Sequence, residues 1–280
     1  MEQEQNLNSM KNDITNCLQK LKPRVVQTNK QEQSHYKCCK CKDTGRYFYK
    51  DDRGIEFVKV CECGFEAREV MNRRLRFANI PEKYKDVRFD NFDLSIFDGA
   101  DAKKMQEAFK IVATYFEHFE EMKEQGRGLY LYSTCKGSGK TRLAISLANE
   151  LIYNKNQPVK FATSLQILNE IKNTWNNDTQ QNESQLLDNL VTTDVLIIDD
   201  FGTEKSKDWI NEKFFHIIDG RYLNDKITIV TSNYDIKTID YDDRITSRLD
   251  EKCYKVEFPN KSVRRINADN ADMDFMMKFM

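Results

Sequence analysis

The stretch GRGLYLYSTCKGSGKTRLAISLANE, residues 126–150, restricts the fold more than any other part of the chain. A short apolar run at 129–132 is followed by a loop of small residues, and apolar side chains then recur at the spacing of an amphipathic helix. These helical side chains are Leu143, Ile145, Leu147, Leu151 and Ile152. The pattern predicts a strand, a loop and a helix in that order.

The loop matches the phosphate-binding template G-x-x-x-x-G-K-[ST] at Gly139, Lys140 and Thr141, although Thr134 occupies its first position. Gly137 and Gly139 let successive backbone N–H groups turn inward around phosphate oxygens. The positive end of the following helix dipole points at the same place. The alternative is a chance Gly-Ser-Gly turn, but the strand and helix predicted around the loop favour a nucleotide site.

The polar side chains of this loop have distinct predicted roles. Lys140 would reach the β- and γ-phosphates of ATP, and Thr141 would hold Mg²⁺. Ser138 and Arg142 complete the predicted nucleotide-binding set. We therefore expect ATP and Mg²⁺ as cofactors.

A second apolar run, Val195 to Ile198, ends in Asp199 and Asp200. A buried parallel strand that delivers a carboxylate at its C-terminal end, opposite the phosphate loop, is the Walker B arrangement. Asp199 would hold the Mg²⁺ shell, and Asp200 stands where a carboxylate can polarise an attacking water. The alternative is a strand that only leads into an acidic turn.

The next predicted strand, KITIVTSNYD, ends in polar side chains including Asn233, which could sense a γ-phosphate. The segment DDRITSRLDEK then places Arg244 and Arg248 four residues apart on one helical face. Arg248 would either reach an ATP on a neighbouring subunit or form an ordinary ion pair with Asp243 or Glu251. The spacing does not favour one over the other.

The amino-terminal third contains a cysteine pattern, Cys38-x-x-Cys41 followed by Cys61-x-Cys63. The turn sequences KDTG and DDRG between the pairs predict a hairpin with one pair on a tight turn at each end, as in a zinc ribbon. Four thiolates would close a structural Zn²⁺ site. Cys39 is a rival to Cys38, and an iron–sulfur cluster or buried thiols remain alternatives.

Aromatic and basic residues alternate over 46–50, between the cysteine pairs. This composition suits stacking on single-stranded DNA, but a small hairpin also needs such side chains to cover a metal. A basic helix end follows, with Arg68, Arg73, Arg74 and Arg76. It is either a patch that contacts phosphates or a solvated helix face.

Composition excludes a membrane-spanning protein and leaves nucleic acid open. No stretch approaches about eighteen apolar residues, and the amino terminus lacks the apolar core of a signal peptide, so we expect a cytoplasmic protein that contacts no membrane. Lys and Arg number 44 against 45 Asp and Glu, for a net charge of −1. Only local clusters can therefore indicate DNA contacts.

The chain divides into four predicted parts. They are a polar tail or short helix (1–34), a cysteine-rich zinc module with a basic helix (35–80), a connector (81–98) and an ATPase domain (99–280). The short helix would carry Ile14, Leu18 and Leu21 on one face. In the last part we expect helices over 100–124, 165–175 and 206–223, a strand over 158–164 and a surface loop over 173–184.

Four segments, GLYLYSTCKGSGKTRLA, VLIIDDFG, IVTSN and DRITSRL, together resemble the AAA+ ATPases. More narrowly, they resemble the bacterial replicative helicase loaders of the DnaC/DnaI type and the related IstB transposition ATPases. The pattern C-x-x-C-x-D-T-G…C-x-C is similar to the zinc module that precedes the ATPase in some of these loaders. The resemblance covers residues 36–258 best.

The resemblance implies an α/β P-loop fold with a parallel sheet between helices, and ATP hydrolysis. Asn233 looks like sensor 1, Arg248 like the arginine finger, and Arg264 in the run KSVRR like a sensor 2 arginine. Two features depart from the family pattern. Thr134 replaces the first glycine of the phosphate loop, and few residues follow Phe258, so we expect a reduced C-terminal lid.

The function that this resemblance implies is that of a loader for a hexameric replicative helicase on single-stranded DNA. Subunits would self-associate through the ATPase domain, and the zinc module and the tail would hold the helicase. One alternative is an IstB-like partner of a transposase. Another is a nucleotide-gated adaptor that binds ATP and DNA with negligible turnover, because Asp200 stands where Glu is more usual.

Overall fold

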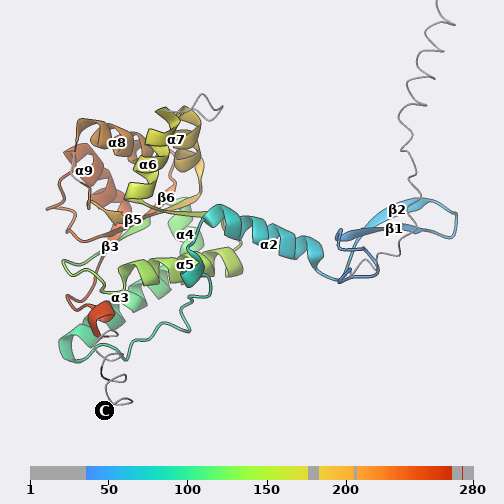
Figure 1. Cartoon of the computed structure of the whole chain (residues 1–280), viewed down its shortest axis with the longest axis horizontal. Helices are drawn as coiled ribbons and strands as arrows, with labels where there is room; N and C mark the ends of the chain where they lie inside the picture. Colours follow the sequence, from blue (N-terminus) through green and yellow to red (C-terminus); the bar gives the residue numbers. More distant parts are fainter. Residues whose placement is uncertain (1–35, 176–182, 205–206, 267–272, 274–280) are drawn as a thin grey trace, which may run out of the picture. The chain divides into compact units, whose positions relative to one another are not determined.

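The structure is a computed structural model that describes residues 36–175, 183–204, 207–266 and 273 (Figure 1). It contains two compact units, Met1–Cys63 and Gly64–Met280, each of which is considered by itself. The helices predicted for the tail and for the C-terminal segment DNADMDFMMKFM lie outside the described residues, apart from the helical Met273. No helix in the described ranges is both long and apolar enough to cross a bilayer.

The first unit is built on a β-hairpin of β1 (Arg46–Lys50) and β2 (Glu56–Val60), which pair antiparallel. The carboxylate of Asp51 accepts hydrogen bonds from the backbone N–H groups of Arg53 and Ile55 and fixes the turn. Gly54 has a φ of +79°, a conformation that glycine adopts without strain. The predicted hairpin between the two cysteine pairs is therefore present.

The second unit alternates helices and strands. In order it contains α2 (Phe65–Ala78), the short 3₁₀ helix η1 (Glu82–Tyr84), α3 (Gly99–Glu117), α4 (Phe119–Glu124), β3 (Gly128–Tyr132), α5 (Lys140–Asn154), β4 (Val159–Thr163), α6 (Ser164–Trp175), α7 (Glu183–Thr192), β5 (Val195–Phe201), α8 (Asp208–Leu223), β6 (Ile227–Ser232), α9 (Asp243–Lys252) and β7 (Cys253–Glu257). Strand, phosphate loop and helix follow one another at β3 and α5 as predicted.

A parallel sheet with the strand order β4-β5-β6-β3-β7 forms the middle layer of this unit. Helices α6, α7, α8 and α9 cover one face, and α3 and α5 cover the other (Figure 1). Successive strand residues face opposite layers, so Leu129 packs toward α5 while Tyr130 packs toward α8 and α9. The C-terminal ends of the neighbouring strands β5, β6 and β3 therefore lie on the same side of the sheet, which is where ligands bind in open α/β sheets.

Several boundaries differ from the predictions. The helix expected over 100–124 is interrupted at His118, which separates α3 from α4. The surface loop was expected over 173–184, but helix α6 extends to Trp175 and helix α7 begins at Glu183, so both ends of that range are helical. Strand β7 was not predicted; only Cys253 and Val256 of its five residues are buried, so the strand lacks the alternation of apolar and polar residues that would indicate it. Helix α2, grouped with the cysteines in the sequence analysis, packs on β4 and α5 in the second unit.

Candidate functional site

The phosphate loop has the backbone that its glycines predict. Gly137 has a φ of +84° and Gly139 a φ of +98°, and both values lie in the left-handed region that disfavours side chains. Gly139 directly precedes Lys140, the first residue of α5, so the free N–H groups of that helix open into the loop. The arrangement suits a phosphate anion.

The ammonium group of Lys140 is buried and held by oxygen atoms. Its Nζ lies 3.0 Å from the carbonyl oxygen of Cys135, 3.3 Å from Ser138 Oγ and 3.1 Å from Asn233 Oδ1. Burial lowers the pKa of Lys140. Neutral oxygen partners compensate this charge only in part, so the site favours an incoming anion.

The carboxylate of Asp199 lies beside the first turn of α5. Thr141 Oγ1 donates to Asp199 Oδ1 at 2.8 Å, and Thr231 Oγ1 donates to the same oxygen at 2.6 Å. Burial raises the pKa of Asp199, whose side chain is almost fully enclosed. A hydroxyl and a carboxylate in contact are the oxygen donors that Mg²⁺ prefers, so this pair fits the predicted magnesium site.

Asp200 projects from an irregular point of β5. Its φ is +54°, and the register of β5 against β6 shifts between Ile198 and Phe201. The backbone is fixed on both sides, because its N–H donates to Thr231 Oγ1 and its carbonyl accepts from Ser164 and Thr203. Asp adopts this left-handed backbone more readily than Glu does. The local backbone thus gives a physical reason for an aspartate at this position.

These residues surround a cavity of about 620 Å³. Of the predicted set, it is lined by Gly137, Ser138, Gly139, Lys140, Thr141, Arg142, Asp200, Asn233 and Arg264. Asp199 lies behind Thr141. The opposite wall comes from the connector, with Tyr84, Phe92, Asp93, Ile96 and Phe97. This wall was not predicted from the sequence, although the aromatic residues of a polar connector were a usable signal.

The connector is fastened to α5. Glu150 receives a bidentate ion pair from Arg88, with Nε–Oε1 at 2.7 Å and Nη2–Oε2 at 2.9 Å. The side-chain amide of the buried Asn149 donates to the carbonyls of Tyr84 and Val87 at 3.1 and 2.7 Å. The helix that begins at the phosphate loop therefore also positions the cavity's apolar wall.

Arg248 lies outside this cavity. Its Nε is 2.6 Å from Asp219 Oδ1 on α8. Its guanidinium lies over the ring of Phe215, with Cζ 5.0 Å from the ring centroid. The expected ion-pair partners Asp243 and Glu251 are therefore wrong, because α8 packs against α9 and supplies a closer carboxylate. Arg244 pairs with Asp242 instead.

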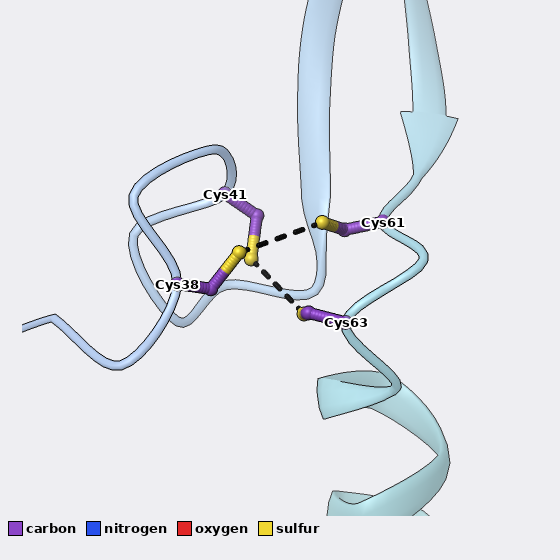
Figure 2. A group of neighbouring side chains, drawn as sticks. All are labelled: Cys38, Cys41, Cys61 and Cys63. Atoms are coloured by element: carbon purple, nitrogen blue, oxygen red, sulfur yellow. Dashed lines mark hydrogen bonds between the residues drawn. The ribbon is translucent and has the colours of Figure 1, made fainter.

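The cysteines of the first unit gather at one end of the hairpin (Figure 2). The sulfur atoms of Cys38, Cys41, Cys61 and Cys63 all lie within 4.8 Å of one another, with Cys38–Cys61 at 3.7 Å and Cys41–Cys63 at 3.5 Å. A tetrahedral zinc with Zn–S bonds of about 2.3 Å places its sulfurs about 3.8 Å apart. The cluster therefore fits one metal ion better than a multi-iron cluster, whose thiolates bind different iron atoms.

The cluster contains Cys38 rather than its rival Cys39, which is exposed and outside the cluster. The backbone N–H groups of Cys41 and Lys40 point at the Cys38 sulfur and lower the pKa of its thiol to about 7. Cys38 therefore reaches the thiolate form near neutral pH. At Cys61 a backbone N–H of Cys63 favours the thiolate, but burial and the neighbouring thiols raise the pKa to about 12.

The arginines of α2 lie on its surface. Arg74 donates to Asn156, Arg73 donates to the carbonyl of Glu69, and Arg76 pairs loosely with the Glu69 carboxylate at 3.9 Å. These contacts leave the charges exposed to solvent. Contact of this face with DNA phosphates stays a prediction.

Comparison with known proteins gives a family and named relatives. Residues 56–271 match the family described as IstB-like ATP binding protein. The phage-like element PBSX protein XkdC of Bacillus subtilis (strain 168) is 27% identical over 226 residues, which are 79% of this chain and 80% of that protein. The replicative helicase loader DnaC of Buchnera aphidicola subsp. Baizongia pistaciae (strain Bp) is 26% identical over 167 residues, which are 60% of this chain and 63% of that protein.

A solved structure shares the fold of the second unit. The crystal structure of the DnaC helicase loader superposes with a TM-score of 0.54 at 22% identity and covers 64% of this chain and 100% of that one. At such identity the likeness supports the fold alone. The chain spans less than two thirds of the length of the Buchnera DnaC protein.

Proposed function

The chain belongs to the family of IstB-like ATP-binding proteins, and we propose that it is a cytoplasmic AAA+ ATPase that loads a replicative helicase onto DNA. The contact between Thr141 and Asp199 carries the ATPase part of this proposal, because it joins two oxygen ligands for Mg²⁺ beside the phosphate loop. The relatives that are named replicative helicase loaders support the loading part.

Each side chain of the cavity has a task in the proposed hydrolysis. Lys140 transfers its hydrogen bonds from Asn233 and Cys135 to the β- and γ-phosphate oxygens. Thr141 and Asp199 hold Mg²⁺, which supplies charge neutralisation when it is bound. Asp200 orients the attacking water and accepts its proton.

Asn233 and the two cavity arginines would complete this site. Asn233 lies next to Lys140, and we infer from this contact that it would sense the γ-phosphate. Arg142 and Arg264 line the cavity and would neutralise phosphate charge. The hydrolysis step would then depend on residues at the C-terminal ends of three strands, β3, β5 and β6, and on the C-terminal segment.

Arg248 would act on a neighbouring subunit. Because it does not line its own cavity and lies on the exterior helix α9, it can serve a site in another copy of the chain. Its ion pair with Asp219 would have to open on assembly. Self-association through the second unit follows from this assignment.

The first unit would hold the helicase. The strand register places Phe48 opposite Val58 and Arg46 opposite Val60, so these side chains share one face of the hairpin. Phe48, Val58 and Val60 are 76%, 55% and 56% exposed, which is unusual for apolar side chains on a small sheet. Zinc bound by the four thiolates would keep this face rigid.

Native mass spectrometry of the full chain with a hexameric replicative helicase, ATP and Mg²⁺ tests the loading role. We expect a defined complex that the double change Phe48→Ser and Val58→Ser abolishes. The matched control is Tyr49→Ser with Phe57→Ser, which removes a stacked aromatic pair from the opposite face. Absence of a complex with the natural chain would contradict the helicase-loading role.

Two other functions have specific support. The IstB-like family description favours a transposase partner, which the same experiment would show as a complex with a transposase instead of a helicase. The short side chain of Asp200 favours an adaptor with negligible turnover. Measured turnover that Asp200→Asn abolishes supports the ATPase, whereas a natural chain that binds ATP without turnover supports the adaptor.

A further inference from the structure

After β7 the chain crosses the outside of the phosphate loop, and we call residues 258–266 the C-terminal strap. Phe258 N–H donates to the carbonyl of Tyr132 at 2.8 Å, and Val263 N–H donates to the carbonyl of Gly137 at 3.0 Å. A side chain at Gly137 would collide with Ser262 and approach Arg264. The strap therefore packs directly on the loop, and it brings Val263 and Arg264 to the cavity.

The strap has a second attachment at the start of the loop. Asn260 Oδ1 accepts hydrogen bonds from Thr134 Oγ1 and from Ser133 Oγ, both at 2.9 Å. The Ser133 hydroxyl shares its hydrogen with the carbonyl of Pro259 at 3.0 Å. Thr134 stands at the first template position, where a glycine has no hydroxyl to offer. The departure from the template is thus the group that binds the strap.

We propose that Thr134 and Asn260 form a latch that positions Arg264 against the phosphates of the bound nucleotide. The latch lies four residues before Arg264, and the Val263–Gly137 bond lies one residue before it, so the two attachments fix both the position and the direction of the arginine. Lys261 adds an ion pair with Asp98, but that carboxylate is 85% exposed and contributes little. Thr134 and Asn260 are positioning residues, because neither lines the cavity.

This inference rests on the proposed ATP site and is independent of helicase loading. If the latch positions Arg264, the loss of the latch and the loss of the arginine must not be additive. Without the latch, Arg264 would already be misplaced, and its removal would then cost little more. A merely structural role of Thr134 would weaken folding without this coupling.

Equilibrium binding of a fluorescent, non-hydrolysable ATP analogue with Mg²⁺ tests the coupling in the full chain. We expect Arg264→Ala to weaken binding about tenfold in the natural chain and about twofold or less in Thr134→Val. Thr134→Val alone should weaken binding about three- to tenfold, the range of one net hydrogen bond. Thr134→Ser keeps the hydroxyl and should bind like the natural chain.

Asn260→Ala provides an independent route to the same result, and thermal melting without nucleotide checks that each variant is folded. Equal fold-losses from Arg264→Ala in the natural and Thr134→Val backgrounds would overturn the latch. So would a Thr134→Val chain that binds the analogue normally. A natural chain that does not bind the analogue would overturn the ATP site itself, and the latch with it.

Discussion

The two units of this protein use side chains in opposite ways. In the second unit both faces of the sheet are covered, and residues such as Leu129, Leu147 and Ile197 are completely buried. In the described part of the first unit the hairpin side chains remain largely exposed, and the buried side chains are Cys41 and Cys61. The contrast teaches that apolar burial stabilises the second unit, whereas the described part of the first unit has no comparable apolar core and would depend on a metal at its thiol cluster.

The predicted metal sites differ in the same way. The thiols of the first unit would hold that unit together through a metal, with apparent binding energies on the order of 10 kcal/mol in small zinc domains. The carboxylate of Asp199 belongs to a unit with a full core, where its burial is unfavourable until a cation arrives. The zinc site would stabilise the fold of the first unit, whereas the folded core of the second unit would hold the magnesium site in place.

The largest expected effect is the loss of the first unit when a thiol ligand is removed. Cys41→Ser should unfold the hairpin, because three thiolates cannot replace a core that this unit lacks. Zinc content should fall toward zero, while ATP binding and the melting of the second unit stay unchanged. Metal analysis and differential scanning calorimetry measure both. A hairpin that stays folded without metal would contradict the claim that the first unit depends on a metal whereas the second depends on its apolar core.

The converse change is made in the core of the second unit. Leu147→Ala on α5 should lower its free energy of unfolding by about 2–5 kcal/mol, because it leaves a cavity between α5 and the sheet. Denaturant unfolding gives this value. Zinc content of the first unit serves as the internal control and should not change.

Asp199→Asn should have a smaller effect of opposite sign. Burial raises the pKa of Asp199 in the folded protein above its value in the unfolded chain, so folding favours the protonated carboxyl. As the pH rises from the unfolded pKa through the folded pKa, this carboxyl progressively destabilises the nucleotide-free protein. We expect the Asn variant to melt at a higher temperature at neutral pH, with a gap that closes on acidification.

The same variant should lose the stabilisation that Mg²⁺ and ATP confer on the natural chain. Thermal melting with and without Mg²⁺ and ATP measures this loss. A variant that is less stable at neutral pH and still responds to Mg²⁺ would contradict the contrast between the two metal sites.

The smallest effect is expected at the surface of the second unit. Asp219→Asn removes the partner of Arg248 and should cost about 0.5 kcal/mol, as for other partly exposed ion pairs. Chemical denaturation of this variant and of Leu147→Ala would compare how much a surface ion pair and a core side chain each contribute to the free energy of unfolding of the second unit. A loss above about 2 kcal/mol would mean that the pair organises the packing of α8 on α9.

The sequence predicted those features that short segments determine. The phosphate loop, the strand that carries Asp199 and the two cysteine turns each depend on a few adjacent residues, and the fold class and the family are confirmed. Features that depend on distant packing were missed. Arg248 pairs with Asp219 on another helix, and the connector wall and the contact of Thr134 with Asn260 join segments far apart in the chain.

The fastening of the connector has a consequence for nucleotide traffic. One side of the cavity is anchored by the bidentate Arg88–Glu150 pair and the buried amide of Asn149, whereas the C-terminal strap on the other side is held partly by the exposed hydroxyl of Thr134. Opening the connector breaks the ion pair of Arg88 and the buried hydrogen bonds of Asn149, whereas the exposed Thr134–Asn260 bond of the strap can be exchanged for hydrogen bonds with water. We therefore expect bound nucleotide to enter and leave the cavity beside the C-terminal strap rather than past the connector.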